Sequence, residues 1–186
     1  MGLFSLEHGK AAYRADFALY GAAVLGLAAF LFAGEPQVPR LAVVALAVLG
    51  LASWTGIEYV LHRFVLHGLQ PFKGWHELHH QRPTAIISAP TILSASLITA
   101  LVFVPAYALS DLRHACAFTL GVLAGYLAYG VTHHATHHWR AQGAWLKRRK
   151  RWHALHHHAT DVPGCYGVTS EFWDHVFGTT GRAAQR

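Results

Sequence analysis

The segment "ACAFTLGVLAGYLAYGVTHHATHH" (residues 115–138) joins a long apolar run directly to four histidines. Its apolar part, residues 115–131, reaches the lower limit of about 17 residues for a helix that crosses a membrane. The histidines recur four positions apart, so pairs of them share one face of a helix, as ligands of a metal ion do. The segment therefore predicts a membrane-spanning helix that ends in a metal site.

Three further apolar stretches precede this one, at residues 17–33, 41–61 and 86–109. The chain of 186 residues is 53% hydrophobic and only 13% charged, which is too apolar for an ordinary soluble domain. We therefore expect an all-α integral membrane protein built on a bundle of four transmembrane helices. The first stretch also has the character of a signal peptide, but it is longer than such a core and follows no compact basic segment.

Prolines and glycines in these stretches are consistent with helices in a bilayer. Pro90 and Pro105 would interrupt a soluble helix, whereas membrane helices tolerate proline. Gly121 and Gly125 form a small-xxx-small pair, which predicts that the fourth helix lies close to a neighbouring helix.

The short connections at residues 34–40 and 110–114 make the helices two antiparallel hairpins. The N-terminus, the segment after the second helix and the C-terminal segment then share one membrane face. Of the 15 Lys and Arg residues only Arg40 and Arg113 fall on the opposite face. The positive-inside rule thus makes the histidine-bearing face cytoplasmic, in a bacterial inner membrane or its equivalent. This topology explains the net charge of +6 and makes a nucleic-acid partner unnecessary.

Sixteen histidines are the anomaly of the composition, and most lie in four clusters on that face. The clusters are "HRFVLH" (62–67), "HELHH" (76–80), "HHATHH" (133–138) and "HALHH" (153–157). In HxxHH the first and third histidines converge on one ion, and the middle one is able to reach a second ion. Histidines five apart diverge by roughly 140° on a straight α-helix, so the first pair serves different ions or needs a local bulge.

Simpler interpretations explain the clusters less well. A lone histidine near a membrane boundary is usually structural, and a solvated histidine tract lacks regular spacing. A metal transporter holds its ligands near the middle of the bilayer, and a haem site needs two histidines rather than ten. The repeated spacing favours a site for two metal ions.

The ordered set HxxxxH, HxxHH, HxxxH and HxxHH resembles the fatty acid hydroxylase and sterol desaturase superfamily of membrane di-iron enzymes. "YGVTSEFWDHVFGTT" (166–180) is similar to the C-terminal signature of that superfamily, and "GIEYVLHRFVLH" (56–67) to its first histidine box. The resemblance implies that residues 1–186 form one hydroxylase-like membrane domain. Its four spans would carry a cytoplasmic, histidine-rich helical cap, residues 132–180, that holds a dimetal site.

The resemblance further implies ten metal ligands, which are His62, His67, His76, His79, His80, His133, His137, His153, His156 and His157. His134 and His138 also fit HxxxH, but "YGVTH" gives His133 the position of the superfamily's ligand. His158 lies outside the pattern.

Carboxylates are expected beside the ligands, because two divalent ions held only by histidines carry about four uncompensated charges. Glu58, Glu77 and Asp174 are the candidates for orienting imidazole N–H groups and offsetting this charge. Asp174 lies within the C-terminal signature, whereas Glu77 is also explained as a solvated helix residue.

The activity implied by the resemblance is hydroxylation of a lipid C–H bond, most naturally on a fatty acyl chain, with two iron ions as cofactor and O2 as co-substrate. The alternatives are a carotenoid ring hydroxylase, a sterol oxidase or desaturase and, without enzymatic activity, a metal transporter or haem-binding protein. The chain is too short to include a fused cytochrome b5-like domain, so a separate cytochrome b5-like protein or a ferredoxin with its reductase is the expected electron donor. We expect "KRRKR" (147–151) to contact anionic lipid headgroups, with docking of an acidic redox protein as the alternative.

Overall fold

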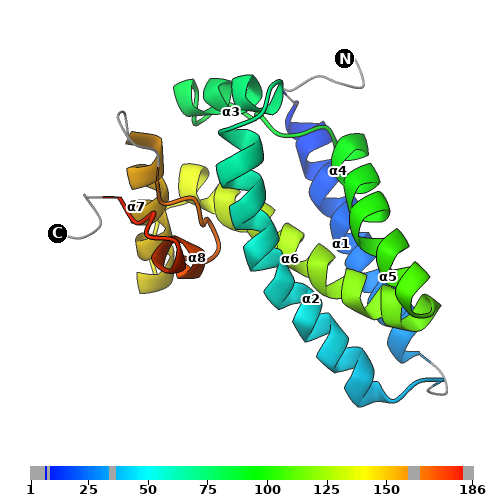
Figure 1. Ribbon diagram of the computed structural model, residues 1–186. Coiled ribbons are helices and arrows are strands. Elements are labelled where there is room, and N and C mark those ends of the chain that lie inside the picture. Colours follow the sequence, from blue (N-terminus) through cyan, green and yellow to red (C-terminus); the bar gives the residue numbers. More distant parts are fainter. Residues whose placement is uncertain (1–6, 8, 34–36, 159–163, 182–186) are drawn as a thin grey trace. The chain divides into compact units, whose positions relative to one another are not determined.

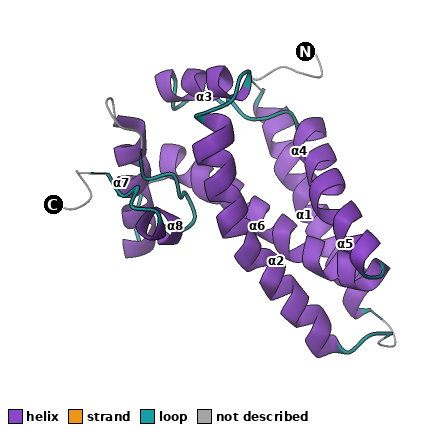
Figure 2. Ribbon diagram, in the orientation of Figure 1, coloured by secondary structure: helices purple, strands orange, loops and turns teal. Residues whose placement is uncertain are grey.

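The computed structural model describes residues 7, 9–33, 37–158 and 164–181, and in this part of the chain Figure 2 shows helices and loops without a strand. The helices are α1 (Lys10–Phe32), α2 (Arg40–Val60), the π-helical turn η1 (Leu61–Leu66), α3 (Phe72–Gln81), α4 (Thr91–Ile98), the π-helical turn η2 (Thr99–Phe103), α5 (Val104–Leu109), α6 (Leu112–His138), α7 (Ala144–His158) and α8 (Phe172–Val176). The all-α prediction is confirmed.

Four helical stretches are long and apolar enough to cross a membrane, as the sequence predicted. They are Lys10–Phe32, Arg40–Leu66, Thr91–Leu109 and Leu112–His138. The first, second and last are longer than expected, since polar residues continue these helices beyond their apolar runs. Part of the connection predicted at 34–40 lies outside the described residues, because 34–36 are not described.

Prolines explain where the third span departs from its predicted range. It begins at Thr91 rather than at residue 86, with Pro90 in an extended conformation immediately before it. A residue that precedes proline disfavours the helical conformation, so Ala89 does not continue the helix backwards. Within the span, η2 precedes Pro105, whose missing N–H removes one bond of the α-helical ladder.

The chain divides into two compact units. The first unit comprises residues 1–54 and 86–127, and it contains most of the apolar length of the spans. Its core consists of Leu31, Val43, Cys116, Ala117 and Leu120. Outside this core, the hydroxyl of Tyr20 lies 2.7 Å from that of Ser94, which ties α1 to α4.

Close helix packing in the first unit depends on the predicted glycine pair. A Cβ atom on Gly121 would overlap the backbone of Ala47 and Leu51 in α2, and one on Gly125 would overlap the side chain of Trp54. The prediction of a close approach is thus confirmed, and α2 is the neighbour.

The second unit comprises residues 55–85 and 128–186. It contains η1, α3, α7 and α8, together with the C-terminal ends of α2 and α6 (Figure 1). All four histidine clusters belong to this unit, although residues 81–132 separate the second cluster from the third in the sequence.

Candidate metal centre

A π-helical turn accounts for the five-residue spacing of His62 and His67. η1 continues α2, and the backbone N–H of His67 donates to the carbonyl of His62 at 3.2 Å. In such a turn, bonding from i to i+5 brings residues five apart onto the same side. The two imidazole rings lie 5.3 Å apart, so the backbone has the local bulge that was one of the two alternatives, and both histidines belong to one group.

The two HxxHH motifs distribute their histidines as their helical spacing predicts. In α3, His76 and His80 point to one site and His79 to another. In α7 the arrangement is reciprocal, because His153 and His157 join His79 while the middle residue, His156, joins the pair from α3. Each helix therefore contributes to both sites.

The ten histidines form two groups of five, within each of which the candidate ligand nitrogens lie within 4.8 Å of one another. The first group is His62, His67, His76, His80 and His156. The second group is His79, His133, His137, His153 and His157. The groups adjoin, because the rings of His80 and His157 stack with their centroids 4.2 Å apart.

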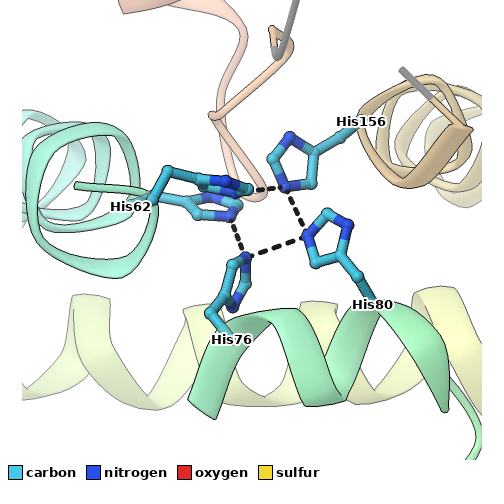
Figure 3. A group of neighbouring side chains, drawn as sticks. His62, His76, His80 and His156 are labelled. Atoms are coloured by element: carbon cyan, nitrogen blue, oxygen red, sulfur yellow. Dashed lines mark hydrogen bonds between the residues drawn. The ribbon is translucent and has the colours of Figure 1, made fainter. Parts of the chain in front are cut away.

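The nitrogen spacing within the first group matches ligands of a single ion. The Nε2 atom of His76 lies 3.0 Å from those of both His62 and His80, and the Nε2 atoms of His80 and His156 are 3.1 Å apart. These nitrogens face one another in Figure 3. Two nitrogens bound about 2.1 Å from one ion and at right angles to each other lie about 3.0 Å apart.

Hydrogen bonds between neutral imidazoles cannot explain all of these short nitrogen–nitrogen distances in the first group. The Nδ1 atoms of His62 and His156 face carbonyl oxygens, so in the neutral rings their Nε2 atoms carry no proton. His76 and His80 would then each have to donate from Nε2, and two N–H groups would oppose each other at 3.0 Å. A cation shared by the lone pairs removes this conflict, so the residues fit a metal ion.

Similar spacings occur in the second group. The Nε2 atoms of His79 and His133 are 3.1 Å apart, those of His137 and His153 are 2.8 Å apart, and those of His153 and His157 are 3.1 Å apart. Both groups are therefore able to bind metal ions.

Burial keeps the imidazoles neutral, which metal binding requires. Burial first, and then the charges of neighbouring imidazoles, lower the pKa of His79 to about 3 and that of His67 to about 4. The same causes lower the pKa of His156 well below its ordinary value. These lone pairs stay available for a metal ion at neutral pH.

Two of the predicted carboxylates contact a loop of the second unit rather than open solvent. Asp174 is completely buried and accepts hydrogen bonds from the backbone N–H groups of Tyr166, at 2.9 Å, and Gly167, at 2.8 Å. Glu58, which is 3% exposed, accepts from the N–H groups of Val168, at 2.6 Å, and Thr169, at 2.9 Å. Both carboxylates thus bind the backbone that carries the carbonyl of Tyr166.

The remaining predicted residues belong to neither histidine group. The Glu77 side chain is 55% exposed and pairs with Lys73 at 3.8 Å, as a solvated helix residue does. His134 and His138 stack on each other with ring centroids 4.5 Å apart and belong to neither group. His158 is exposed.

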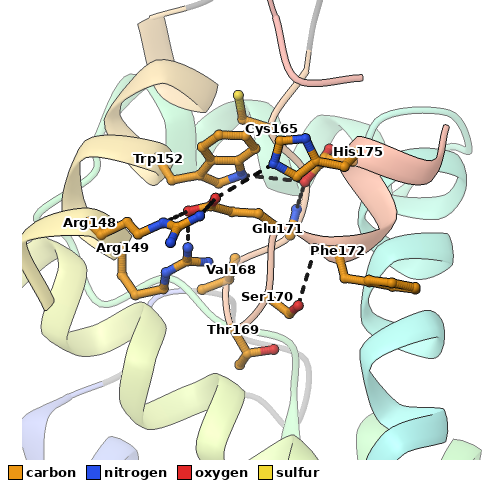
Figure 4. A network of polar contacts seen from close by, with 12 residues as sticks. Arg148, Arg149, Trp152, Cys165, Val168, Thr169, Ser170, Glu171, Phe172 and His175 are labelled. Carbon is orange, nitrogen blue, oxygen red and sulfur yellow. Dashed lines mark hydrogen bonds and ion pairs between the residues drawn. The ribbon is translucent and has the colours of Figure 1, made fainter. Parts of the chain in front are cut away.

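The basic run of α7, for which we expected contact with lipid headgroups, is only partly exposed. Arg149 is 5% exposed and pairs with the buried carboxylate of Glu171, and Arg148 donates to the same carboxylate from Nε at 2.8 Å (Figure 4). Only Lys147, Arg148 and Arg151 of this run are exposed. Part of the positive charge therefore connects α7 to the segment before α8.

Comparison with known proteins identifies the family. The profile of the family described as "Fatty acid hydroxylase" matches residues 47–179, which include every histidine of both groups. The chain belongs to the fatty acid hydroxylase family.

Its relatives include dihydroceramide fatty acyl 2-hydroxylase FAH2 of Arabidopsis thaliana, with 35% identity over 70% of this chain and 58% of that protein. Ceramide very long chain fatty acid hydroxylase scs7 of Schizosaccharomyces pombe is 33% identical over 77% of this chain and 44% of its own length. The chain therefore spans about half the length of such relatives.

A solved structure titled "Full length scs7p (only hydroxylase domain visible)" superposes with a TM-score of 0.76 and 27% identity. The match covers 94% of this chain and 67% of that one.

Proposed function

We propose that this chain hydroxylates a lipid at the membrane, and that its substrate is a fatty acyl chain attacked at C-2. The pair of adjoining five-histidine groups carries this proposal. The names of the two relatives support the substrate class, since both act on fatty acyl chains of ceramide-type lipids. In such a reaction one oxygen atom of O2 enters the C–H bond, and the other leaves as water with two electrons from a donor and two protons from the solvent.

The proposed cofactor is a pair of iron ions, one in each group, held by the ten histidines through Nε2. Imidazole ligands also suit zinc, copper and nickel, so the choice of iron rests on the chemistry of O2. When bound, iron supplies the redox chemistry that activates O2. The contribution of the chain is to keep ten neutral imidazoles in place, five of them buried and five half-buried.

We further propose that residues 1–186 act as one hydroxylase domain whose histidine-bearing unit faces the cytoplasm. The supporting observation is that only Arg40 and Arg113 among the Lys and Arg residues belong to the opposite ends of the spans. A substrate whose tail stays in the bilayer would meet the site at the membrane boundary. A separate cytochrome b5-like protein or a ferredoxin system would supply the electrons.

Lipid mass spectrometry tests this function. Cells that express the chain should contain acyl lipids heavier by one oxygen atom, with fragmentation that locates the hydroxyl at C-2. His156→Ala should abolish these species, whereas His158→Ala, a substitution on the same helix outside both groups, should retain them. If no oxygenated lipid forms with the intact chain, iron and a reductant present, the proposed function is wrong.

A further inference from the structure

The two histidine groups differ in the hydrogen bonds made by Nδ1, the ring nitrogen that faces away from the other ligands. In the first group, the Nδ1 atom of His62 lies 2.5 Å from the carbonyl oxygen of Tyr166, and that of His156 lies 2.8 Å from the carbonyl oxygen of Gly164. A carbonyl oxygen only accepts, so each Nδ1 must donate and each Nε2 must present its lone pair. In the second group, Nδ1 of His79, His153 and His157 is buried without a hydrogen-bond partner among the described residues.

One residue separates the two carbonyl groups, and its backbone is strained. Cys165 has a φ of 57°, and it is the one residue other than glycine with a positive φ in the described part of the chain. Such a conformation persists only where its surroundings hold it. The N–H of Cys165 donates to the carbonyl of Thr179 at 2.7 Å, and its thiol donates to that of Thr180 at 3.1 Å.

Asp174 holds the loop from one side with both of its carboxylate oxygens. Oδ1 accepts from the N–H of Tyr166 and from the Thr179 hydroxyl at 2.7 Å, while Oδ2 accepts from the N–H of Gly167 and from Nε1 of Trp152 at 3.3 Å. Three of these four partners are N–H donors. An asparagine at this position would place its NH2 group, which is a donor, against at least one of these N–H donors.

Glu58 holds the loop from the other side and joins it to the helix that carries His62. The two residues are four apart on α2 and its continuation η1, so their side chains leave neighbouring turns. Besides accepting from Val168 and Thr169 backbone N–H groups, Glu58 accepts from the Thr169 hydroxyl. The loop is thus fixed to the same helix whose histidine it orients.

From this arrangement we propose that Asp174 and Glu58 are positioning residues for the first histidine group alone. They hold the backbone of the loop Gly164–Thr169, and its carbonyls in turn fix the rings of His62 and His156. Among the described residues, Nδ1 of His79, His153 and His157 in the second group has no such carbonyl partner, so the two metal sites differ in affinity. This inference rests on one part of the proposed function, the binding of metal ions by the two groups. Its test does not require hydroxylation.

Zinc binding to the purified full chain in nanodiscs is the test, with metal content measured over a series of buffered zinc concentrations. His153→Ala removes a ligand of the second group, so the remaining ion reports on the first group; His156→Ala does the reverse. Adding Asp174→Asn to His153→Ala should weaken the remaining site by up to about 10- to 100-fold, the range seen when a metal ligand loses its hydrogen-bond partner, because the carbonyl partners of His62 and His156 would no longer be held in place. Added to His156→Ala, Asp174→Asn should change the zinc affinity of the second group by less than about 2-fold, because substitutions at independent sites do not affect each other.

Two further variants keep the outcome interpretable. Asp111→Asn makes the same chemical change at an exposed residue of the first unit and should alter neither site. Glu58→Gln should lower the zinc affinity of the first group selectively. It replaces Asp174→Asn in the test if that variant does not fold. Equal weakening in both backgrounds, or none in either, would overturn the inference. A chain that passes this test but forms no hydroxylated lipid would contradict the proposed function alone.

Discussion

The first and second histidine groups each contain five imidazoles but are built differently. The first draws on η1 and the residue that follows it, on α3 and on α7, and carbonyls of an irregular loop anchor two of its rings. The second draws on α3, α6 and α7, so regular helices alone supply its ligands. Helical spacing is thus sufficient to gather five nitrogens, while control of the ring tautomers requires backbone groups from elsewhere in the chain.

The largest expected effect tests whether both groups are needed for activity. His156→Ala in the first group and His153→Ala in the second should each reduce the yield of hydroxylated lipid at least about 100-fold, because two ions act together. The yield is measured by mass spectrometry against His158→Ala as control. Substantial activity in either variant would mean that one group is dispensable.

Removal of metal should have the next largest effect, and the two groups should lose their ions at different chelator concentrations. A bound ion at 100 times its dissociation constant stabilises the folded chain by about 2.7 kcal/mol. With increasing chelator, the ion of the second group should leave first, because three of its rings have no carbonyl partner at Nδ1 among the described residues. Thermal unfolding and metal content, followed together, should fall in two steps, and simultaneous release of both ions would contradict this order.

Loosening the spans should affect both groups equally. Gly121→Val places side-chain atoms against the backbone of Ala47 and Leu51, and overpacking of this kind costs about 1–3 kcal/mol. Thermal unfolding should detect this loss, while the ratio of the two zinc affinities stays constant. A change in that ratio would show that the packing of the first unit affects one group selectively.

Acid should weaken the metal-free chain gradually. The pKa of His79 is about 3 and that of His67 about 4 in the folded chain, against about 6.5 when unfolded. Between these values the unfolded chain binds more protons, so folding stability decreases as pH falls from about 6.5 towards 3. Denaturant titrations at several pH values measure this slope, and a stability that is constant across this range would contradict the buried, neutral state of the imidazoles.

The smallest effect is expected at Glu77. Its side chain is exposed and its ion pair with Lys73 lies at the surface, where such pairs contribute about 0–1 kcal/mol. Glu77→Gln should therefore leave both zinc affinities within about 2-fold. A selective loss at the first group, to which the adjacent His80 belongs, would instead make Glu77 a partner of that group.

Local spacing explains which of these features the sequence predicts. Four apolar runs predict the spans, and i, i+4 relations predict how His76, His79 and His80 divide between two sites. The sequence leaves two alternatives for His62 and His67, because spacing alone does not distinguish an α-helical turn from a π-helical one.

Long-range contacts are the part that spacing does not predict. Every residue has a backbone carbonyl, so the sequence does not indicate which carbonyls contact a histidine. The roles of Gly164 and Tyr166 become visible only in the folded loop. Likewise, Arg149 belongs to a basic run and yet is buried against Glu171, 22 residues further along the chain.

The central claim is that ten histidines hold two separate metal ions, and the metal content of the purified chain tests it most directly. The intact chain and His158→Ala should each bind two ions per chain, while His156→Ala and His153→Ala should each bind one. A single ion in the intact chain, or two in both ligand variants, would contradict the account.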